Sequence, residues 1–421
     1  MTDDSTPDDD PTPAGGDADH PVLHGDGTDT PAAYGGTPVR EESMGYGGQS
    51  ITEADKEVVA EALEGNYITR GPTVEQFENR VADLVGVDHA VAVTSGTAAL
   101  HLSGRVAGFS AGDEVITTPL TFASTAHAAT YADATPVFAD IDSHTRNLDP
   151  DAVRAAITED TAGLIPMHYA GHPPDVKVFL DIADEHDLTV IWDACHGFGG
   201  THRGEPVGSR PDMAIFSFHP VKNVTTGEGG AVVTDDDRLA ERLRRLRSFD
   251  MNYTPKGHED EPWYQVTEGE GYNYNITDFQ AALGISQLDR ITEFKRRRDE
   301  IIARYDEAFA DVQGLRTPPD APNSDPIYHL YAVEVREGFG CDRTEFVNAM
   351  HAENIYVQVH YVPLHFHPFF QEEFGYERGD FPETERVYEG LVSLPLYPAM
   401  DDGDVADVVE AVRRLHAYHA G

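Results

Sequence analysis

Lys222 lies in the stretch FSFHPVKNVTTGEGG (216–230), between an apolar run and a glycine-rich loop. The other four lysines of the chain lie in charged or polar surroundings that are typical of a solvated surface. A lysine at a strand end can form a Schiff base with a carbonyl group. The glycines follow the lysine, so the order GxxxxGK[ST] of a phosphate-binding nucleotide loop is absent. This stretch therefore favours covalent chemistry on a carbonyl compound.

Pyridoxal phosphate is the commonest carbonyl partner of such a lysine, and it needs further groups that the sequence offers at strand ends. Asp193 ends the apolar run LTVIW, and a buried carboxylate there would suit a protonated ring nitrogen. Gly96 and Thr97 begin a helix after HAVAVTS, where backbone N–H groups can hold a phosphate. Ser217 can add a hydroxyl to the same phosphate. Phe122, in TPLTFAST, can stack on the ring.

Each of these residues alone has an ordinary structural explanation: a helix cap, a buried acid that holds a loop, or a core phenylalanine. His196, just after the acid, is by itself more often a satisfied buried histidine than a catalyst. What favours a cofactor site is co-occurrence, because the phosphate loop, the ring contact, the acid and the lysine follow in order at strand-to-loop junctions.

An alternation of short apolar runs and helical segments must position these residues. The expected strands are 89–95, 113–119, 135–141, 161–169, 188–195, 213–218 and 230–235. Apolar strands without polar alternation belong to a sheet that is covered on both faces. The order predicts an α/β fold with a mostly parallel central sheet, whose ligand-binding loops lie at the carboxyl ends of its strands.

The pattern divides the chain into three parts. Residues 1–45 contain almost no large apolar side chains, so we predict a disordered acidic tail. Residues 46–290 hold the alternating elements and form the large cofactor-binding domain. Residues 291–421 begin with a long amphipathic helix and continue as a smaller α+β domain.

The chain is strongly acidic. Its 421 residues include 30 Lys and Arg against 75 Asp and Glu, a formal net charge of −45. Such a surface repels nucleic acid and anionic membranes, and it is expected of a halophilic protein, in which concentrated salt screens the self-repulsion. The two cysteines are too few for a disulfide framework or a cysteine-based zinc site. No bilayer-length apolar run and no signal peptide is recognisable, so we expect a cytoplasmic protein.

From about residue 46 to its C-terminus, the chain resembles the sugar aminotransferases of the DegT/StrS type, which are pyridoxal-phosphate enzymes of fold type I. The segments that carry the resemblance are GNYITRGPTVEQFE, VAVTSGTAALHL, AGDEVITTPLTFAST, ATPVFADID, VIWDACHGFGG, FSFHPVKNVTTGEGGAVV, GYNYNITDFQAALG and VHYVPLHFHPFF. Their order and spacing are specific to this family.

The resemblance implies that Lys222 is the Schiff-base lysine and that the cofactor contacts are as proposed above. It adds His196, where the family often has Gln, beside the ring hydroxyl. Asn273 and Asn275 match a segment that, in the family, crosses the dimer interface to the neighbour's cofactor phosphate. The resemblance leaves open which asparagine makes this contact. The implied active unit is a homodimer with two shared sites.

On the substrate side, the resemblance places Thr69 near the sugar and makes His360, Tyr361 and His365 candidate contacts. The alternative for these last three is a histidine-rich structural loop. The run HYVPLHFH contains no carboxylate, so no metal site is predicted there.

Lysine at position 222, where a dehydratase subgroup has histidine, favours transamination. The resemblance then implies glutamate as amino donor and a nucleotide-linked keto-sugar as acceptor, of the UDP-4-keto-6-deoxyhexose type, in surface glycan or polysaccharide biosynthesis.

Two alternatives stay open on the sequence. The first is a regulatory or scaffold protein that keeps the fold, in which the clusters RLRRLRS and KRRR would contact nucleic acid; helical spacing and the overall charge favour solvated helix faces instead. The second is another fold type I enzyme acting on a small amino acid, for which no obvious carboxylate-binding arginine is apparent.

Overall fold

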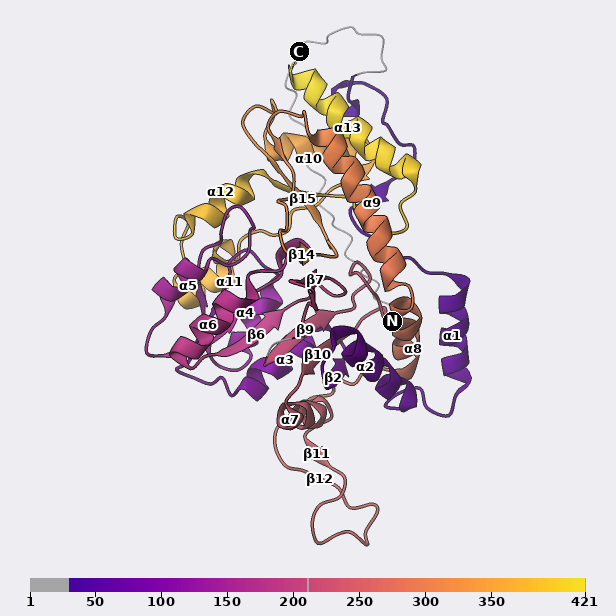
Figure 1. Cartoon of the computed structure of the whole chain (residues 1–421), viewed down its shortest axis with the longest axis vertical. Coiled ribbons are helices and arrows are strands. Elements are labelled where there is room, and N and C mark those ends of the chain that lie inside the picture. Colours follow the sequence, from indigo (N-terminus) through magenta and orange to yellow (C-terminus); the bar gives the residue numbers. More distant parts are fainter. Residues whose placement is uncertain (1–29, 210–211, 421) are drawn as a thin grey trace, which may run out of the picture.

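The computed structural model describes residues 30–209 and 212–420, and its centre is a seven-stranded sheet of order β2-β10-β9-β6-β5-β3-β4 (Figure 1). Its strands are β2 (His89–Val93), β3 (Glu114–Thr117), β4 (Thr135–Phe138), β5 (Thr161–Ile165), β6 (Thr189–Asp193), β9 (Met213–Ser217) and β10 (Gly230–Thr234). Only β10 runs antiparallel to its neighbours, β2 and β9, and the other adjacent pairs are parallel. The predicted α/β fold with a mostly parallel sheet is confirmed.

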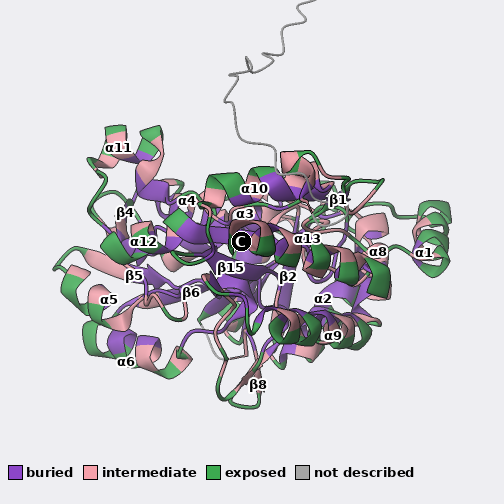
Figure 2. Cartoon of the chain, turned by 90° about the horizontal axis from the view of Figure 1, so that it is seen from above, coloured by how far each residue is buried: buried purple, intermediate pink, exposed green. Residues whose placement is uncertain are grey.

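Helices cover both faces of this sheet. One face packs against α2 (Pro72–Val85), α5 (Pro150–Ala156), α6 (Val176–His186) and α8 (Asp278–Leu288), and the other against α3 (Gly96–Ala107), α4 (Ala123–Thr130) and α7 (Asp237–Arg247). Along β2, Ala90 and Ala92 join the first core, whereas Val91 and Val93 join the second. Figure 2 shows the buried strands enclosed by helices whose outer faces are exposed. Because both sides of each strand are buried, its sequence is apolar throughout.

The C-terminal part has its own core around a three-stranded antiparallel sheet. The strands are β13 (Leu315–Arg316), β15 (Tyr331–Val335) and β17 (Leu391–Leu394), and the helices are α9 (Ile291–Phe309), α10 (Arg343–Ala352), α11 (Pro368–Phe374), α12 (Pro382–Gly390) and α13 (Asp402–Ala420). The predicted boundary at residue 290 falls between α8 and α9. The strand expected in IYVQVHY is shorter than predicted, since β16 is only Ile355–Tyr356.

The remaining elements lie at the edges of the molecule. They are α1 (Glu53–Glu64), β7 (Thr201–His202), β8 (Glu205–Pro206), β11 (Met251–Asn252), β12 (Val266–Thr267), β14 (Ser324–Asp325) and the short 3-10 helices η1 (Ala32–Tyr34), η2 (Tyr169–Gly171) and η3 (Leu364–Phe366). The β11–β12 hairpin projects from the end opposite α9 and α13 (Figure 1). Among the described helices, none combines the length and apolar character needed to cross a membrane.

The prediction of disorder up to residue 45 is wrong for residues 30–45, and its earlier part lies outside the described residues. β1 (Met44–Gly45) pairs in parallel with β16. The buried Glu353 carboxylate accepts hydrogen bonds from the backbone N–H groups of Ala32 and Val39, both at 2.7 Å. Composition misses this order because the partner that holds the segment lies more than 300 residues away in the sequence.

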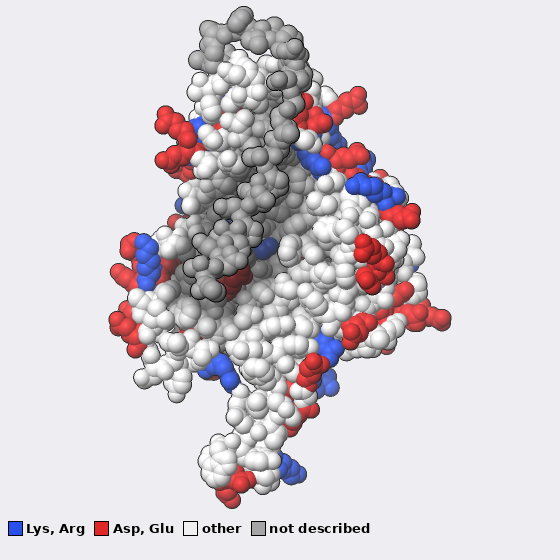
Figure 3. Space-filling view, turned by 180° about the vertical axis from the view of Figure 1, so that it is seen from behind, with Lys and Arg blue, Asp and Glu red and all other residues white. Residues whose placement is uncertain are grey.

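On the face seen in Figure 3, acidic side chains lie at many separate places on the described part of the molecule. The arginine clusters are largely engaged by carboxylates. On α7, Arg245 pairs with Asp250 and Arg247 pairs with Glu78. Along α9, Lys295 pairs with Asp299 and Arg296 pairs with Glu300. The expectation of solvated helix faces holds for these residues but not for Arg298, which is buried and donates to the backbone carbonyl of Leu396 at 2.9 Å.

Candidate active site

A cavity of about 620 Å³ lies where the carboxyl ends of the central strands face the C-terminal domain. The structure brings together at this cavity the following predicted site residues: Gly96, Thr97, Phe122, Asp193, His196, Ser217, Lys222, His360 and Tyr361. They come from segments that are separated by up to 265 positions, counted from residue 96 to residue 361. The strand ends therefore converge on one site, as a mostly parallel sheet predicts.

Lys222 follows β9 in a turn that is closed by a hydrogen bond from its backbone N–H to the carbonyl of His219, at 2.8 Å. No hydrogen bond or ion pair of its amine is found within the described ranges. Burial lowers the pKa of this amine below its ordinary value, although the nearby Cys195 and Asp193 act in the opposite direction. A lowered pKa enlarges the fraction of uncharged amine at neutral pH, and only the uncharged amine attacks a carbonyl.

Asp193 ends β6 and is buried, with 3% of its surface exposed. Its Oδ2 accepts a hydrogen bond from Thr125 Oγ1 at 2.6 Å, and its Oδ1 accepts one from the backbone N–H of Cys195 at 3.2 Å. In the described part of the chain, no arginine, lysine or histidine forms an ion pair with it. A buried carboxylate without a cation is costly, so this one suits a ligand that brings a positive charge.

His196 is buried beside a second histidine, His329, with ring centroids 4.4 Å apart. Burial, followed by the charge of Lys222, holds the pKa of both histidines well below the usual range. Both rings are therefore neutral at physiological pH. His196 Nε2 lies 3.0 Å from the hydroxyl of Tyr361, whereas its Nδ1 is buried without a partner. An unsatisfied buried nitrogen at a cavity is a site for a polar ligand atom.

The first turn of α3 has free backbone donors at the cavity. The side chain of Ser95 caps the helix by accepting from Ala98 N–H at 3.1 Å. The N–H groups of Gly96 and Thr97 have no acceptor among the described residues. A Cβ on Gly96 would lie 2.9 Å from Ser217 Cβ, so glycine is needed for this close approach to β9. Donors at a helix N-terminus beside a serine form a site for an anion.

Phe122 caps α4 at the mouth of the cavity, and 57% of its surface is exposed. Its ring centroid lies 6.1 Å from that of Tyr361. An exposed phenylalanine beside a cavity gains by packing against a flat ligand.

The profile of the DegT/DnrJ/EryC1/StrS aminotransferase family matches residues 49–413. The chain belongs to this family. The spore coat polysaccharide biosynthesis protein SpsC of Bacillus subtilis (strain 168) is 43% identical over 384 residues, covering 89% of this chain and 98% of SpsC. Helicobacter pylori PseC, an aminotransferase involved in the biosynthesis of pseudoaminic acid, has a TM-score of 0.84 and 29% identity, covering 90% of this chain and 100% of PseC. The structure of DesI in the presence of its TDP-sugar product has a TM-score of 0.82 and 35% identity, covering 92% of this chain and 96% of DesI.

Membership in the DegT/DnrJ/EryC1/StrS family makes this chain a pyridoxal-phosphate-dependent sugar aminotransferase of fold type I. The cavity fits that cofactor in three independent respects. Among the described residues, Asp193 has no cationic partner, and a protonated ring nitrogen would supply one. The N–H groups at the start of α3 have no acceptor in that part of the chain, and a phosphate would supply one. The amine of Lys222 has no hydrogen-bond or ion-pair partner within the same ranges, and a carbonyl would supply one. The sequence-based prediction of the family, the fold and the cofactor is confirmed.

Four predicted site residues lie away from this cavity. His365 is buried, and its Nε2 contacts Glu385 Oε1 at 3.0 Å, so its placement supports the structural alternative for the histidine-rich loop. Thr69 forms an isolated bridge with Thr277. Asn275 Oδ1 accepts a hydrogen bond from Ser248 Oγ at 2.6 Å, and Asn275 Nδ2 donates to Asn273 at 3.1 Å. The segments of Thr69 and Asn275 thus lie next to each other, outside the cavity of their own chain.

From the sequence we did not identify two residues that hold the site residues in place through hydrogen bonds. Thr125, one turn into α4, is fully buried and contacts Asp193 as described above. Asn223, directly after the lysine, donates weakly to the backbone carbonyls of His196 at 3.4 Å and Ile327 at 3.2 Å. Its side chain therefore ties the lysine loop to the C-terminal domain. The only feature of the sequence that could have indicated a role for Thr125 is its polar side chain three positions after Phe122.

Proposed function

We propose that this chain converts a nucleotide-linked keto-sugar of the UDP-4-keto-6-deoxyhexose type into an amino sugar, with glutamate as the amino donor. The observation that carries the proposal is the pair formed by Lys222 and Asp193 in one cavity. In the part of the chain that the structure describes, this amine has no partner and this carboxylate has no cation. The resemblance of VHYVPLHFHPFF and GYNYN to members that act on such sugars supports the substrate class. The TDP-sugar product of DesI supports a nucleotide-linked sugar.

Pyridoxal phosphate, when bound, supplies the carbon that accepts the amino group and a ring that withdraws electrons. Lys222 acts as general base on the α-carbon proton of glutamate, and in the second half-reaction it delivers a proton to the sugar carbon that gains the amine. Its lowered pKa suits a base at neutral pH. Asp193, held by Thr125 and the backbone of Cys195, keeps a proton on the ring nitrogen.

The other cavity residues orient the reactants. Gly96, Thr97 and Ser217 would hold the phosphate of the cofactor, and Phe122 would lie against its ring. His196, positioned through Tyr361, donates to the ring hydroxyl. None of Gly96, Thr97, Ser217, Phe122 and His196 carries a negative charge, so the carboxylate of Asp193 is the anionic group that we assign to the ring.

We assign His360 and Tyr361 to the sugar side of the cavity. His360 Nδ1 lies 2.9 Å from Ser393 Oγ, and burial lowers the pKa of this histidine to about 4. The ring is therefore neutral when the enzyme works, and it offers a hydrogen bond rather than a charge. We do not extend the substrate role to His365, because its ring is occupied by Glu385.

We propose a homodimer with shared active sites. Tyr67 and Ile68 are 62% and 50% exposed, and they adjoin the segment of Thr69 and Asn275. We take this pair of neighbouring exposed apolar side chains as support for an interface at this place. On this proposal, Asn273 or Asn275 contacts the cofactor phosphate of the partner subunit.

A complementation experiment tests the shared site. Lys222→Ala and the double variant Asn273→Ala/Asn275→Ala are each expected to be inactive alone. After unfolding and refolding together, half of the dimers are mixed and each has one intact site, so about a quarter of wild-type activity should return. Activity that stays absent in the mixture, while both variants elute as dimers, would contradict sharing.

We place this reaction in surface glycan or polysaccharide biosynthesis, as the name of SpsC supports. A cytoplasmic location agrees with Cys195 and Cys341, which are both free thiols in the structure.

The experiment that tests the function is incubation of the cofactor-loaded protein with glutamate and a panel of UDP- and TDP-linked 4-keto and 3-keto sugars. Mass spectrometry should detect a new amino sugar together with 2-oxoglutarate, and the largest yield is expected from a UDP-linked 4-keto-6-deoxyhexose. Lys222→Ala is the matched control and should give no product. Absence of product from every keto-sugar would overturn the proposed substrate while leaving cofactor binding intact.

A further inference from the structure

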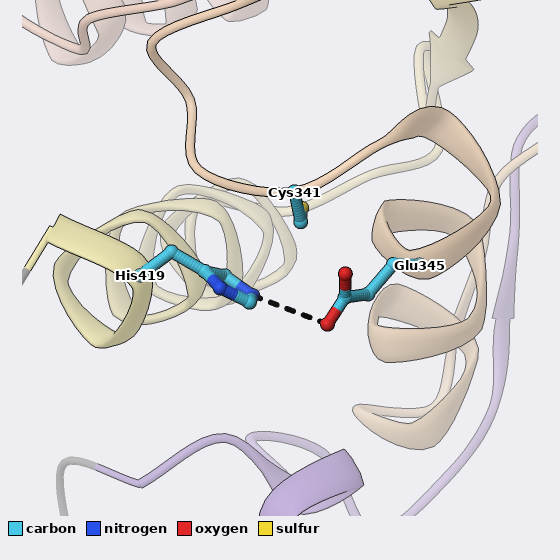
Figure 4. A group of neighbouring side chains, drawn as sticks. All are labelled: Cys341, Glu345 and His419. Carbon is cyan, nitrogen blue, oxygen red and sulfur yellow. Dashed lines mark ion pairs between the residues drawn. The ribbon is translucent and has the colours of Figure 1, made fainter.

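A second group of ligand-type side chains lies far from the active-site cavity, in the C-terminal part. Cys341, Glu345 and His419 each place one ligand atom within 4.8 Å of the other two (Figure 4). The cysteine precedes α10, the glutamate lies in the first turn of α10, and the histidine lies in the last turn of α13. In Figure 4 the three side chains point into the same space between the two helices.

The backbone around this group is built for close approach. Gly340 has φ +104°, and a Cβ there would lie 2.5 Å from His419 Cβ, so only glycine lets α13 come this near to the loop. Asp342 caps α10 by accepting from the N–H of Glu345 at 2.8 Å, which fixes the first turn. Tyr34, from the ordered N-terminal segment, donates to Glu345 at 2.5 Å and lies 3.2 Å from His419 Nε2.

The spacing and chemistry of the three atoms suit a metal ion. Zinc binds sulfur at about 2.3 Å and nitrogen or oxygen at about 2.0–2.2 Å, so tetrahedral ligands lie roughly 3.3–3.7 Å apart. His419 Nε2 and Glu345 Oε1 are already 3.7 Å apart. Because the three ligand atoms lie within 4.8 Å of one another, the thiol must come closer to the other two by up to about 1.5 Å, which requires small rotations of the Cys341 and Glu345 side chains. Thiolate, imidazole and carboxylate are all ligands that zinc accepts.

The local charge also favours a cation. The carboxylates of Glu345 and Asp342 lie close to the Cys341 thiol, and a divalent ion would neutralise part of their negative charge.

We propose that Cys341, Glu345 and His419 form a binding site for a divalent transition-metal ion such as Zn²⁺, with the hydroxyl of Tyr34 or a water as fourth ligand. The ion would join the end of α13, the start of α10 and the N-terminal segment. Its role is structural, since none of these residues lines the active-site cavity. From the number of cysteines we excluded a cysteine-based zinc site in the sequence, and we did not consider one cysteine combined with a carboxylate of α10 and a histidine of α13.

The test loads the intact cofactor-bound protein with Co²⁺ in concentrated KCl, which suppresses nonspecific binding to the acidic surface. The expected result is one ion per chain after dialysis, with visible cobalt absorption at wavelengths beyond those of the cofactor. Cys341→Ala and His419→Gln should each lose the ion and the absorption. Cys195→Ala, which removes the other thiol of the chain, should keep both.

Thermal unfolding of the wild-type protein provides a second test, which does not depend on whether the variants fold. Zn²⁺ should raise the Tm of the wild-type protein, and a chelator should reverse the rise, because a ligand that binds only the folded state stabilises it. Glu345→Gln should reduce this shift while its aminotransferase activity stays at the wild-type level. Three results would overturn the proposal: no bound cobalt, cobalt absorption that persists in Cys341→Ala, or a Tm of the wild-type protein that does not respond to zinc.

Discussion

Replacement of Gly230 by alanine would test how the phosphate end of the cavity is built. Gly230 opens β10 opposite Ser217, and a Cβ there would lie 2.5 Å from the carbonyl carbon and oxygen of Ser95 and 2.7 Å from the nitrogen of Gly96. Non-bonded carbons normally stay about 3.5–4.0 Å apart. The start of α3 must therefore move by roughly 1 Å, and overpacking of this kind costs about 1–3 kcal/mol of folding stability.

The same shift would weaken cofactor binding. Charge-assisted N–H···O bonds are about 2.7–2.9 Å long, so a displacement of roughly 1 Å breaks a bond from the N–H of Gly96 or Thr97 to a phosphate. Losing one such bond costs about 1.5–3 kcal/mol, which weakens the affinity for pyridoxal phosphate about 10- to 150-fold.

Titration of the apoprotein with pyridoxal phosphate, followed by absorbance, measures this affinity, and urea unfolding measures the stability of the same variant. Gly45→Ala is a matched control, because its nearest atom would be 3.7 Å away, and it should bind the cofactor like the wild-type protein. Wild-type affinity and wild-type stability in Gly230→Ala would refute the assignment of the α3 N-terminus to the phosphate.

Three further changes have defined outcomes. Thr125→Val removes the hydroxyl that donates to buried Asp193 and should lower the free energy of unfolding of the apoprotein by about 1.5–3 kcal/mol in urea; an unchanged value would contradict the hydrogen bond. Burial lowers the folded-state pKa of Lys222, so the folded apoprotein binds fewer protons and its stability rises with pH up to the unfolded pKa of about 10.4. Lys222→Met should therefore raise the free energy of unfolding at neutral pH, and this increase should shrink as the pH rises. An increase that grows with pH would contradict the lowered pKa of Lys222. Glu353→Ala removes the acceptor that holds the N-terminal segment and should make Arg40 cleavable by trypsin, whereas equal resistance to cleavage would count against that anchor.

The positions of the cofactor-side residues were predictable because they end strands. Asp193 and Ser217 are the last residues of β6 and β9, and an apolar run followed by a polar residue shows where a buried strand reaches the sheet edge. Once the sheet is mostly parallel, those ends must meet. The direction of β10 was not predictable in this way, because the connection over residues 218–229 is long enough for either a parallel or an antiparallel pairing with β9.

Residues that act through helix rotation or through distant contacts were not predictable. Thr125 reaches Asp193 only because α4 turns that face inward. The same helix also contains Ser124 and Thr130, so the sequence alone does not show which hydroxyl contacts the carboxylate. His365 was a candidate by its loop, but the loop turns it toward Glu385 instead. Order in residues 30–45 depends on Glu353, which no local pattern connects to that segment.

The most direct test of the active site is reduction of the cofactor-loaded protein with borohydride, which fixes the cofactor to the amine that carries it. The chain has five lysines, so proteolysis and mass spectrometry can assign the modified one. We expect the added mass on Lys222 alone, and Lys222→Ala should neither be modified nor show the absorbance of a lysine-bound pyridoxal. Modification of Lys56, Lys177, Lys256 or Lys295 in place of Lys222 would contradict this assignment.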